Sequence, residues 1–400
     1  MIRIYVALNK RDVFIILGFL LLMFVGYLFL RGVNNSSDFE ITDELGGNLF
    51  PSSIISLATS NELIIEPSHT PYLGNPKSGI GIRMEARKHN SHVRIEIAET
   101  PFSYHSVSEF VLPQKGQSYT VYPEIVWKYD VLRESQQPTP MSIVATVISD
   151  NLASTLKVRT FSMRSINECM YGYYRIDEKQ RRQFVNTPIF FAAYVNEDSP
   201  LIDKVLREAL NTRIVNRFLG YQSDSTAVVR QVYALWNVLQ RRQFKYSSIS
   251  NSSLGSNVVY AQRVRSLEDA LSTSQINCVD GSVLFASLLR AINIDPILVL
   301  KPGHMFVGFY TDKRHENKLF LETSMIGNID FDDYFPDEAI DSLFTGKSQN
   351  EMSRITFQKS IEYASDKYVA DSLMIREEHP GYMFLELSDK VRSKIQSIGK

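Results

Sequence analysis

The chain has 400 residues, of which 44% are hydrophobic and 11% aromatic, and its formal net charge is −1. This length exceeds what one hydrophobic core usually holds, so two or three folded units are expected, and the composition excludes a disordered chain. The net charge near zero, without a cluster of Lys and Arg interleaved with aromatic residues, argues against a nucleic-acid partner.

Residues 13–30 contain no charged side chain and predict a transmembrane helix. As a helix this stretch would span about 27 Å, close to the ~30 Å hydrocarbon core of a bilayer. A cleaved signal peptide is the competing interpretation. The stretch is long for the apolar h-region of a signal peptide, however, and no sequence resembling A-x-A follows it before Arg31.

The residues on either side of this predicted helix indicate its orientation. Arg3, Lys10 and Arg11 precede it, whereas acidic residues predominate after it. Because Lys and Arg are enriched on the cytoplasmic side of membrane helices, residues 1–12 are expected to form a cytoplasmic tail. We therefore expect a single-pass membrane protein whose bulk is periplasmic or extracellular.

The next segments change in composition from linker to strand. Residues 31–50 carry Asn, Ser and Gly pairs and predict a linker. Residues 51–165 show short runs with period-two alternation, such as Val93, Ile95 and Ile97, separated by Gly and Pro. An antiparallel β-sandwich domain is therefore expected there. Residues 166–198 are expected to connect it to the next domain.

Helical patterns begin at Ser199, which is followed by Pro200 as at many helix starts. Apolar periodicity then continues toward Gly220, and a second helix is expected over residues 225–242. With the helix and strands considered below, residues 199–345 predict an α+β domain whose helices pack on an antiparallel sheet.

No metal or cofactor is expected from the remaining motifs. Asp330, Asp332 and Asp333 could suggest calcium, but the segment lacks the Gly and the terminal Glu of an EF-hand loop. Capping of a helix around residues 336–344 explains these carboxylates. The four histidines of the predicted sandwich do not have metal-ligand spacing; they are His69, His89, His92 and His105. Residues 346–400 predict a helical extension without active residues.

A helix whose apolar residues recur from Val283 to Ile292 is predicted directly after Asn277, the expected N-cap. Asp280 stands at the capping-box position and is expected to face the backbone rather than the sulfur of Cys278. The thiol of Cys278 then lies in the first turn, where unpaired N–H groups and the helix dipole favour the thiolate, the reactive form.

Two strands follow, over residues 303–310 and 319–323, and predict a β-hairpin. A register with His304 opposite Glu322 would centre the turn on Lys313, and any even shift still keeps both side chains on one face. A cysteine at a helix start, followed by an imidazole and a carboxylate on neighbouring strands, is the pattern of a nucleophile with its base and orienting acid.

These motifs resemble the transglutaminase-like core, a relative of papain-type cysteine proteases, over roughly residues 225–325. The matching segments are Ser266-Leu267-Glu268-Asp269-Ala270-Leu271, Asn277-Cys278-Val279-Asp280, Phe285-Ala286-Ser287-Leu288-Leu289-Arg290-Ala291-Ile292-Asn293-Ile294 and Gly303-His304-Met305, with Trp236 and Phe244-Lys245-Tyr246 upstream.

The resemblance implies that Cys278 is the nucleophile, His304 the general base and Glu322 the orienting carboxylate, where family members usually have Asp. It also implies that an oxyanion is bound by the N–H of Cys278 and an upstream side chain. Gln275 and Trp236 are the candidates for that second donor.

The sequence thus predicts a membrane-anchored cysteine enzyme that acts on amide bonds of a protein or peptide substrate. Water as acceptor would make it a protease or amidase, and an amine would make it a transglutaminase. The alternative is a catalytically inert fold that serves as an envelope scaffold or binding module. Cys169 is the one possible disulfide partner of Cys278, and we expect the two to stay apart. The sequence does not define an oligomeric state.

Overall fold

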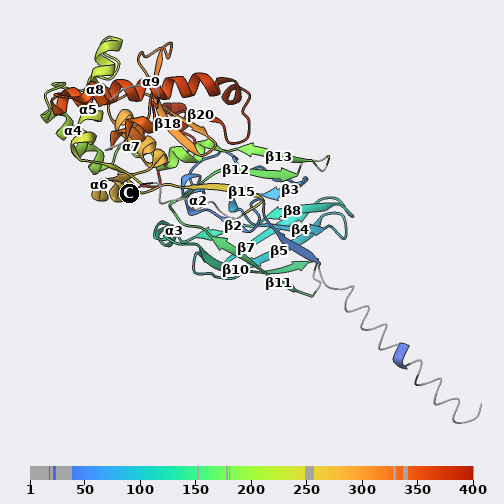
Figure 1. The fold of residues 1–400 in the computed structure, drawn as a ribbon. Helices are drawn as coiled ribbons and strands as arrows, with labels where there is room; N and C mark the ends of the chain where they lie inside the picture. The colour runs from blue at the N-terminus through green and yellow to red at the C-terminus, as the bar shows by residue number, and fades with distance from the viewer. Residues whose placement is uncertain are drawn as a thin grey trace, which may run out of the picture. The chain divides into compact units, whose positions relative to one another are not determined.

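The computed structural model describes residues 18, 21–23, 38–150, 153–176, 179, 181–247, 256–327, 330–336 and 341–399. They form a mixed α+β structure with several separate sheets (Figure 1), which confirms the predicted fold class at that level. They divide into two compact units. Of the described residues from 38 onward, the first unit holds 38–43, 69–126 and 142–160, and the second holds the others.

The predicted transmembrane helix, residues 13–30, lies outside the described part of the chain except for Gly18 and residues 21–23. Within the described ranges, no helix combines the length and the apolar character that a membrane crossing requires.

The first unit is built from strands with alternating burial. One sheet has the order β1-β4-β8-β3, and in another β5 lies between β7 and β10, antiparallel to both. Along β5, Val93, Ile95 and Ile97 are buried while His92 and Arg94 are exposed, which confirms the predicted two-residue period. The bounds are β1 Phe39–Thr42, β3 Tyr72–Gly74, η1 Pro76–Ser78, β4 Gly81–Glu85, β5 Ser91–Ile97, β6 Ser103–Tyr104, β7 Ser106–Leu112, β8 Ser118–Tyr122, β9 Val126–Trp127, β10 Thr139–Ser149 and β11 Thr155–Met163.

Several segments differ from the expected organisation. The expected linker, residues 31–50, contains β1 and β2 (Asn48–Leu49). The expected sandwich, residues 51–165, contributes α2 (Pro51–Ser56) and α3 (Tyr129–Arg133) to the second unit. The expected connector, residues 166–198, forms β12, β13 and η2, whose apolar residues enter the core of the second unit. Short, irregularly spaced strand segments carry too few periodic positions to reveal this from sequence.

The second unit contains two main sheets and the helices that pack on them. One sheet has the antiparallel order β13-β12-β15, and the other has the order β19-β18-β17-β20. Its bounds are β12 Glu168–Ile176, β13 Arg182–Asn186, η2 Pro188–Tyr194, α4 Pro200–Asn211, α5 Ser225–Arg241, β14 Lys245–Tyr246, β15 Val259–Arg263, α6 Leu267–Thr273, β16 Gln275–Ile276, α7 Cys278–Ala291, β17 Pro296–Lys301, β18 His304–Tyr310, β19 Lys318–Leu321, η3 Thr323–Ile326, η4 Phe331–Asp333, α8 Asp341–Phe344, α9 Gln349–Arg376, β20 Met383–Glu386 and α10 Asp389–Arg392.

Local signals position the helices largely as expected. Ser199 caps α4 through Leu201 N (3.3 Å), and Asp224 caps α5 through Ala227 N (2.8 Å). The first of these helices ends at Asn211 rather than near Gly220, because the chain turns at Arg213, whose φ is +61°. The residues from 346 onward are not only helical, since β20 joins the sheet beside β17.

The sheet β19-β18-β17-β20 is buried on both faces. Leu298 and Val307 lie in the core that includes α7, whereas Val299 and Phe306 pack with Ala364 of α9. Successive side chains of a strand point to opposite faces, so a strand covered on both sides reads as a continuous apolar run. Residues 297–300 and 305–310 show such runs.

Helix α7 approaches η3 closely at Gly281. A Cβ at this position would lie 2.7 Å from Oγ1 and 2.9 Å from Cβ of Thr323. We expect Gly281→Ala to lower the free energy of unfolding by about 1–3 kcal/mol because of this overpacking. At an ordinary helix position the same change would add about 1 kcal/mol. Urea denaturation shows whether Gly281→Ala lowers or raises the free energy of unfolding. Thr323→Ala in the same chain removes Oγ1 and should recover part of the loss; a stabilised Gly281→Ala protein would contradict the close packing.

Candidate active site

The thiol of Cys278 lies at the first residue of α7, and the predicted capping box is confirmed. The Asn277 side chain accepts a hydrogen bond from Asp280 N (2.8 Å), and the Asp280 carboxylate accepts one from Asn277 N (3.1 Å). Cys278 is 8% exposed. The first-turn N–H groups have no helical acceptor and carry the positive end of the helix dipole, so they stabilise negative charge at this position.

Asp280 faces the backbone, as expected. Its carboxylate accepts hydrogen bonds from Asn277 N and from Arg265 N (2.8 Å), and the Arg265 guanidinium lies 3.6 Å away. Burial raises the pKa of Asp280, against the lowering effect of these partners. The carboxylate is therefore committed to the helix start and to Arg265 rather than to the sulfur of Cys278.

The hairpin of β18 and β19 brings His304 and Glu322 together. In this hairpin Val307 lies opposite Leu321. The register is therefore shifted by two positions from one that would place His304 directly opposite Glu322. An even shift leaves both side chains on one face, as the sequence predicted. The His304 Nε2 atom lies 2.6 Å from Glu322 Oε2.

Glu322 is fully buried and held by several hydrogen bonds. Its Oε1 accepts from Ser324 N (3.1 Å) and Ser324 Oγ (2.6 Å), and Ser324 Oγ lies 2.9 Å from the Tyr334 hydroxyl. The Glu322 backbone N donates to Ser360 Oγ of α9 (2.9 Å). Burying a carboxylate costs several kcal/mol unless it is paired and hydrogen-bonded. These partners explain why Glu322 can lie away from water.

His304 interacts with both Cys278 and Glu322. Burial alone would lower the pKa of His304, but the interaction with the Cys278 thiol and the hydrogen bond to Glu322, together with the negative charges of these groups, raise it to about 10. Because Nε2 is engaged by Glu322, Nδ1 is the ring nitrogen left for the sulfur. The imidazole is therefore held in its charged form at neutral pH, between the thiol and the carboxylate.

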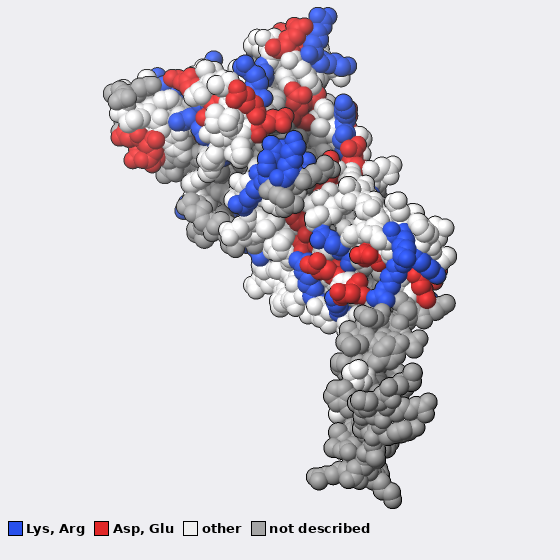
Figure 2. Space-filling model, turned by 90° about the vertical axis from the view of Figure 1, so that its right-hand side faces the viewer, with Lys and Arg blue, Asp and Glu red and all other residues white. Residues whose placement is uncertain are grey.

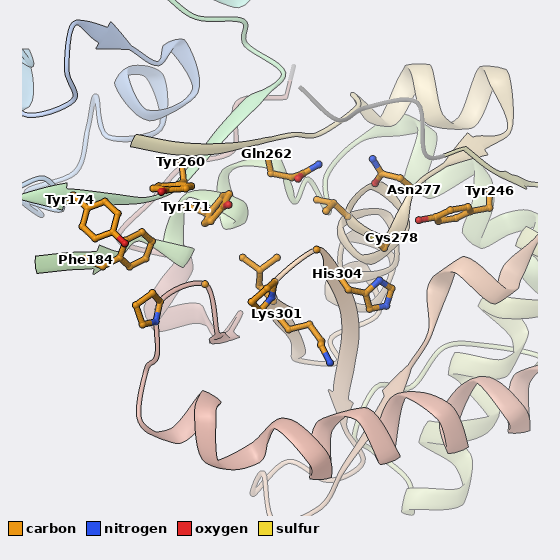
Figure 3. A pocket seen from close by; sticks show the side chains of 16 residues that line it. Tyr171, Tyr174, Phe184, Tyr246, Tyr260, Gln262, Asn277, Cys278, Lys301 and His304 are labelled. Atoms are coloured by element: carbon orange, nitrogen blue, oxygen red, sulfur yellow. The ribbon is translucent and has the colours of Figure 1, made fainter. Parts of the chain in front are cut away.

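A cleft of about 320 Å³ opens onto these groups (Figure 3). Cys278, His304 and Tyr246 line it, and the Tyr246 hydroxyl interacts with the Cys278 side chain. Burial and the charge at Cys278 raise the pKa of Tyr246 to about 12. Tyr246 therefore keeps its phenolic proton at neutral pH and can act as a donor.

Neither proposed second donor lies at the cleft. Trp236 is fully buried and packs against Phe285 and Phe357 in the core. Gln275 is exposed on β16 and does not line the cleft. The parallel pairing of β14 with β16 instead brings Tyr246 opposite Ile276, beside the start of α7. This pairing joins segments about thirty residues apart, and the local sequence pattern does not indicate it.

Sequence reasoning also missed Ser324, Tyr334 and Ser360, which hold Glu322. Serine and tyrosine are common throughout protein sequences, so the spacing of these residues carries no signal. Asp330, considered above for calcium, caps the short helix η4 through Asp332 N (3.1 Å).

Both cysteines are free thiols, as expected. Cys169 lies in β12 and is fully buried, and burial raises its pKa well above the ordinary range. Cys169 is therefore an inert core residue, and it provides an internal reference for the reactivity of Cys278.

The sequence was compared with known proteins. No family model matches the chain, and no curated protein matches it either. The functional assignment therefore rests on the residues and the geometry of this site.

The elevated pKa of His304 predicts a specific titration. A pKa raised from about 6.5 to about 10 means that the stabilisation by the charged imidazole is complete below pH about 6.5 and is lost as pH rises through about 10. Glu322→Gln removes one of the two raising charges, so we expect the His304 midpoint to fall. NMR of histidine-labelled protein measures the titration midpoint of His304 in wild type and in Glu322→Gln. The His304 signal is assigned by its absence in His304→Gln. Glu316→Gln, an exposed change on the same hairpin, is the control. A wild-type midpoint near 6.5 would refute the charged pair.

Proposed function

We propose that this protein is a cysteine enzyme that acts on amide bonds through Cys278, His304 and Glu322. The observation that carries the proposal is the position of one imidazole, which interacts with a thiol at a helix start and is hydrogen-bonded to a buried carboxylate. A nucleophile, a base within hydrogen-bonding reach and a group that orients the base are the parts that covalent acyl transfer requires.

In the proposed reaction, the sulfur of Cys278 forms a bond to the amide carbonyl carbon, and the carbonyl electrons move to oxygen. His304 then donates its Nδ1 proton to the leaving nitrogen as the C–N bond breaks, so an amine departs and a thioester remains. Glu322 stabilises the charged imidazole and keeps Nδ1 directed at the sulfur. After the amine has left, the neutral imidazole is a base.

In the second half of the reaction the thioester is hydrolysed, and His304 acts as a base instead of an acid. His304 removes a proton from water, the resulting oxygen nucleophile adds to the carbonyl carbon, and the thiolate leaves with its bonding electrons as the acid product forms. An amine in place of water would give a new amide. We favour hydrolysis, because water is always present and the described cleft shows no separate amine-binding site.

Two donors would stabilise the oxyanion. The N–H of Cys278 belongs to the first helical turn, where backbone donors have no helical acceptor. We assign the second donor to the Tyr246 hydroxyl, which is protonated at neutral pH and already contacts the thiol. This assignment replaces Trp236 and Gln275.

The arrangement supports a transglutaminase-like core. The helix that carries Cys278 packs against the sheet whose neighbouring strands supply His304 and precede Glu322. Glu322 stands where the family usually has Asp; it is the N-cap of η3, and its side chain accepts a hydrogen bond from Ser324 N. The paired strands of the first unit support the proposed sandwich.

We further propose that residues 13–30 anchor the enzyme in a membrane with its bulk outside the cytoplasm, on the strength of the apolar stretch and its flanking charges. A peptide or protein substrate, rather than a nucleic acid, agrees with the net charge of −1. Basic and acidic side chains both occur across the face shown in Figure 2.

The activated thiol predicts fast alkylation. At pH 6 an ordinary thiol is mostly protonated, so we expect iodoacetamide to modify Cys278 roughly 100-fold faster than glutathione. Cys278→Ala should abolish this labelling and all amide turnover while the protein stays folded, and His304→Gln should slow the labelling. Cys169 should react only after denaturation, and Cys169→Ala should label like wild type. Labelling no faster than glutathione would favour the inert scaffold.

The role assigned to Tyr246 predicts an effect on acylation. Tyr246→Phe removes one oxyanion donor, so acylation by a p-nitrophenyl ester should slow roughly 100-fold, the usual loss for such a donor. Alkylation by iodoacetamide forms no oxyanion and should slow far less. Stopped-flow measurement of the nitrophenol burst gives the first rate. Equal slowing of both reactions would assign Tyr246 to the thiol alone.

A further inference from the structure

The cleft continues from Cys278 to an aromatic platform on the sheet β13-β12-β15 (Figure 3). The platform consists of four rings that line the cleft: Tyr171, Tyr174, Phe184 and Tyr260. Three of these side chains are half-buried, and Tyr260 is 37% exposed. The proposed chemistry uses none of them, so their presence in the cleft calls for a separate explanation.

The strand β12 is shaped to present these rings. Its pairing with β15 shifts register between Met170 and Gly172, a β-bulge that contains Tyr171. Bulges change the direction of a side chain and are common beside active sites. Gly172 leaves space for a ring, since a Cβ there would lie 2.4 Å from the Phe184 ring. Phe184 can therefore lie across the strand, between Tyr174 and Tyr260.

The rings pack at steep angles to one another. Phe184 lies 5.0 Å from Tyr174 at 73° and 5.7 Å from Tyr260 at 67°, while Tyr171 and Tyr260 are 6.3 Å apart at 51°. Edge-to-face packing of this kind accepts a further aromatic ring in the same geometry. Sugars, in contrast, stack on an exposed flat ring face, and the Arg182 guanidinium lies 3.7 Å over the Tyr174 ring.

The polar groups at the platform favour a neutral occupant. The hydroxyls of Tyr171, Tyr174 and Tyr260 have no hydrogen-bond partner among the residues that the structure describes. Lys301, which also lines the cleft, forms an ion pair with Asp371. Arg182 is also engaged, since it lies over the Tyr174 ring and donates to Asn257 O. Because both cations already have partners, a neutral group suits this site better than a charged one.

We propose that the aromatic platform binds an aromatic side chain of an extended peptide, close in sequence to the amide that Cys278 attacks. This inference rests on the proposed function and names its substrate class. Tyr260 and Gln262 share one face of β15 and are separated by about 7 Å, the rise of two strand residues. In Figure 3 Gln262 lies between Tyr260 and Cys278. An extended peptide that passes Gln262 would therefore place its aromatic residue at least about two positions from the reacting amide.

Binding to full-length Cys278→Ala protein tests the platform without using the thiol. The probes are two capped pentapeptides that differ at the central residue, Phe or Ala, with Gly elsewhere, measured by ligand-observed NMR. We expect the Phe peptide to bind roughly tenfold more tightly or better, the ratio for burying one benzyl group. In wild-type protein the Phe peptide should also slow the alkylation of Cys278 by iodoacetamide.

Matched variants locate the effect. Tyr260→Ala should remove the preference for Phe, Tyr260→Phe should retain it, and Tyr129→Ala, an exposed tyrosine on α3, should leave it unchanged. Equal binding of the two peptides, or tighter binding of a neutral oligosaccharide than of the Phe peptide, would overturn the inference. Slow alkylation of Cys278 together with a clear Phe preference would refute the enzyme and leave a peptide-binding site.

Discussion

The hydrogen bond between His304 and the buried carboxylate of Glu322 is the contact on which the site depends. A carboxylate without exposure is tolerable only when its oxygens are occupied, and Ser324 and His304 occupy them. Since Glu322 engages Nε2, only Nδ1 can face Cys278. The direction of the imidazole is thus set by a carboxylate that no substrate can reach.

The sheet β19-β18-β17-β20 is covered by helices on both faces, and this packing keeps the contact between His304 and Glu322 in place. Helix α7 packs on one face and carries the thiol, and α9 packs on the other face and holds the Glu322 backbone through Ser360. A shift of either helix would change the distance between sulfur and imidazole. Close approach at Gly281 limits such a shift for α7. The arrangement of Cys278, His304 and Glu322 therefore depends on three layers rather than on one loop.

Local signals were enough to predict the parts of the site that depend on neighbours in sequence. Spacing predicts the capping box of Asn277 and Asp280, the helix start at Ser199, a helix over about residues 225–242, and the shared face of His304 and Glu322. Tyr246 and Ser360 were missed because they reach the site through pairing and packing between distant segments. The segment 166–198 was taken for a connector because its two strands complete a sheet only with β15, far along the chain. Long-range pairings of this kind leave no periodic trace in a single sequence.

The last segment of the chain closes the second unit. The strand β20 pairs with β17, Gln396 N donates to Ser56 O (3.1 Å), and Ile398 N donates to Ala193 O (2.8 Å). Contacts between residues so far apart form late and slowly during folding. A chain that a protease has cut before Met383 lacks them. The sheet that carries His304 therefore reaches its full width only when residues 383–386 are present.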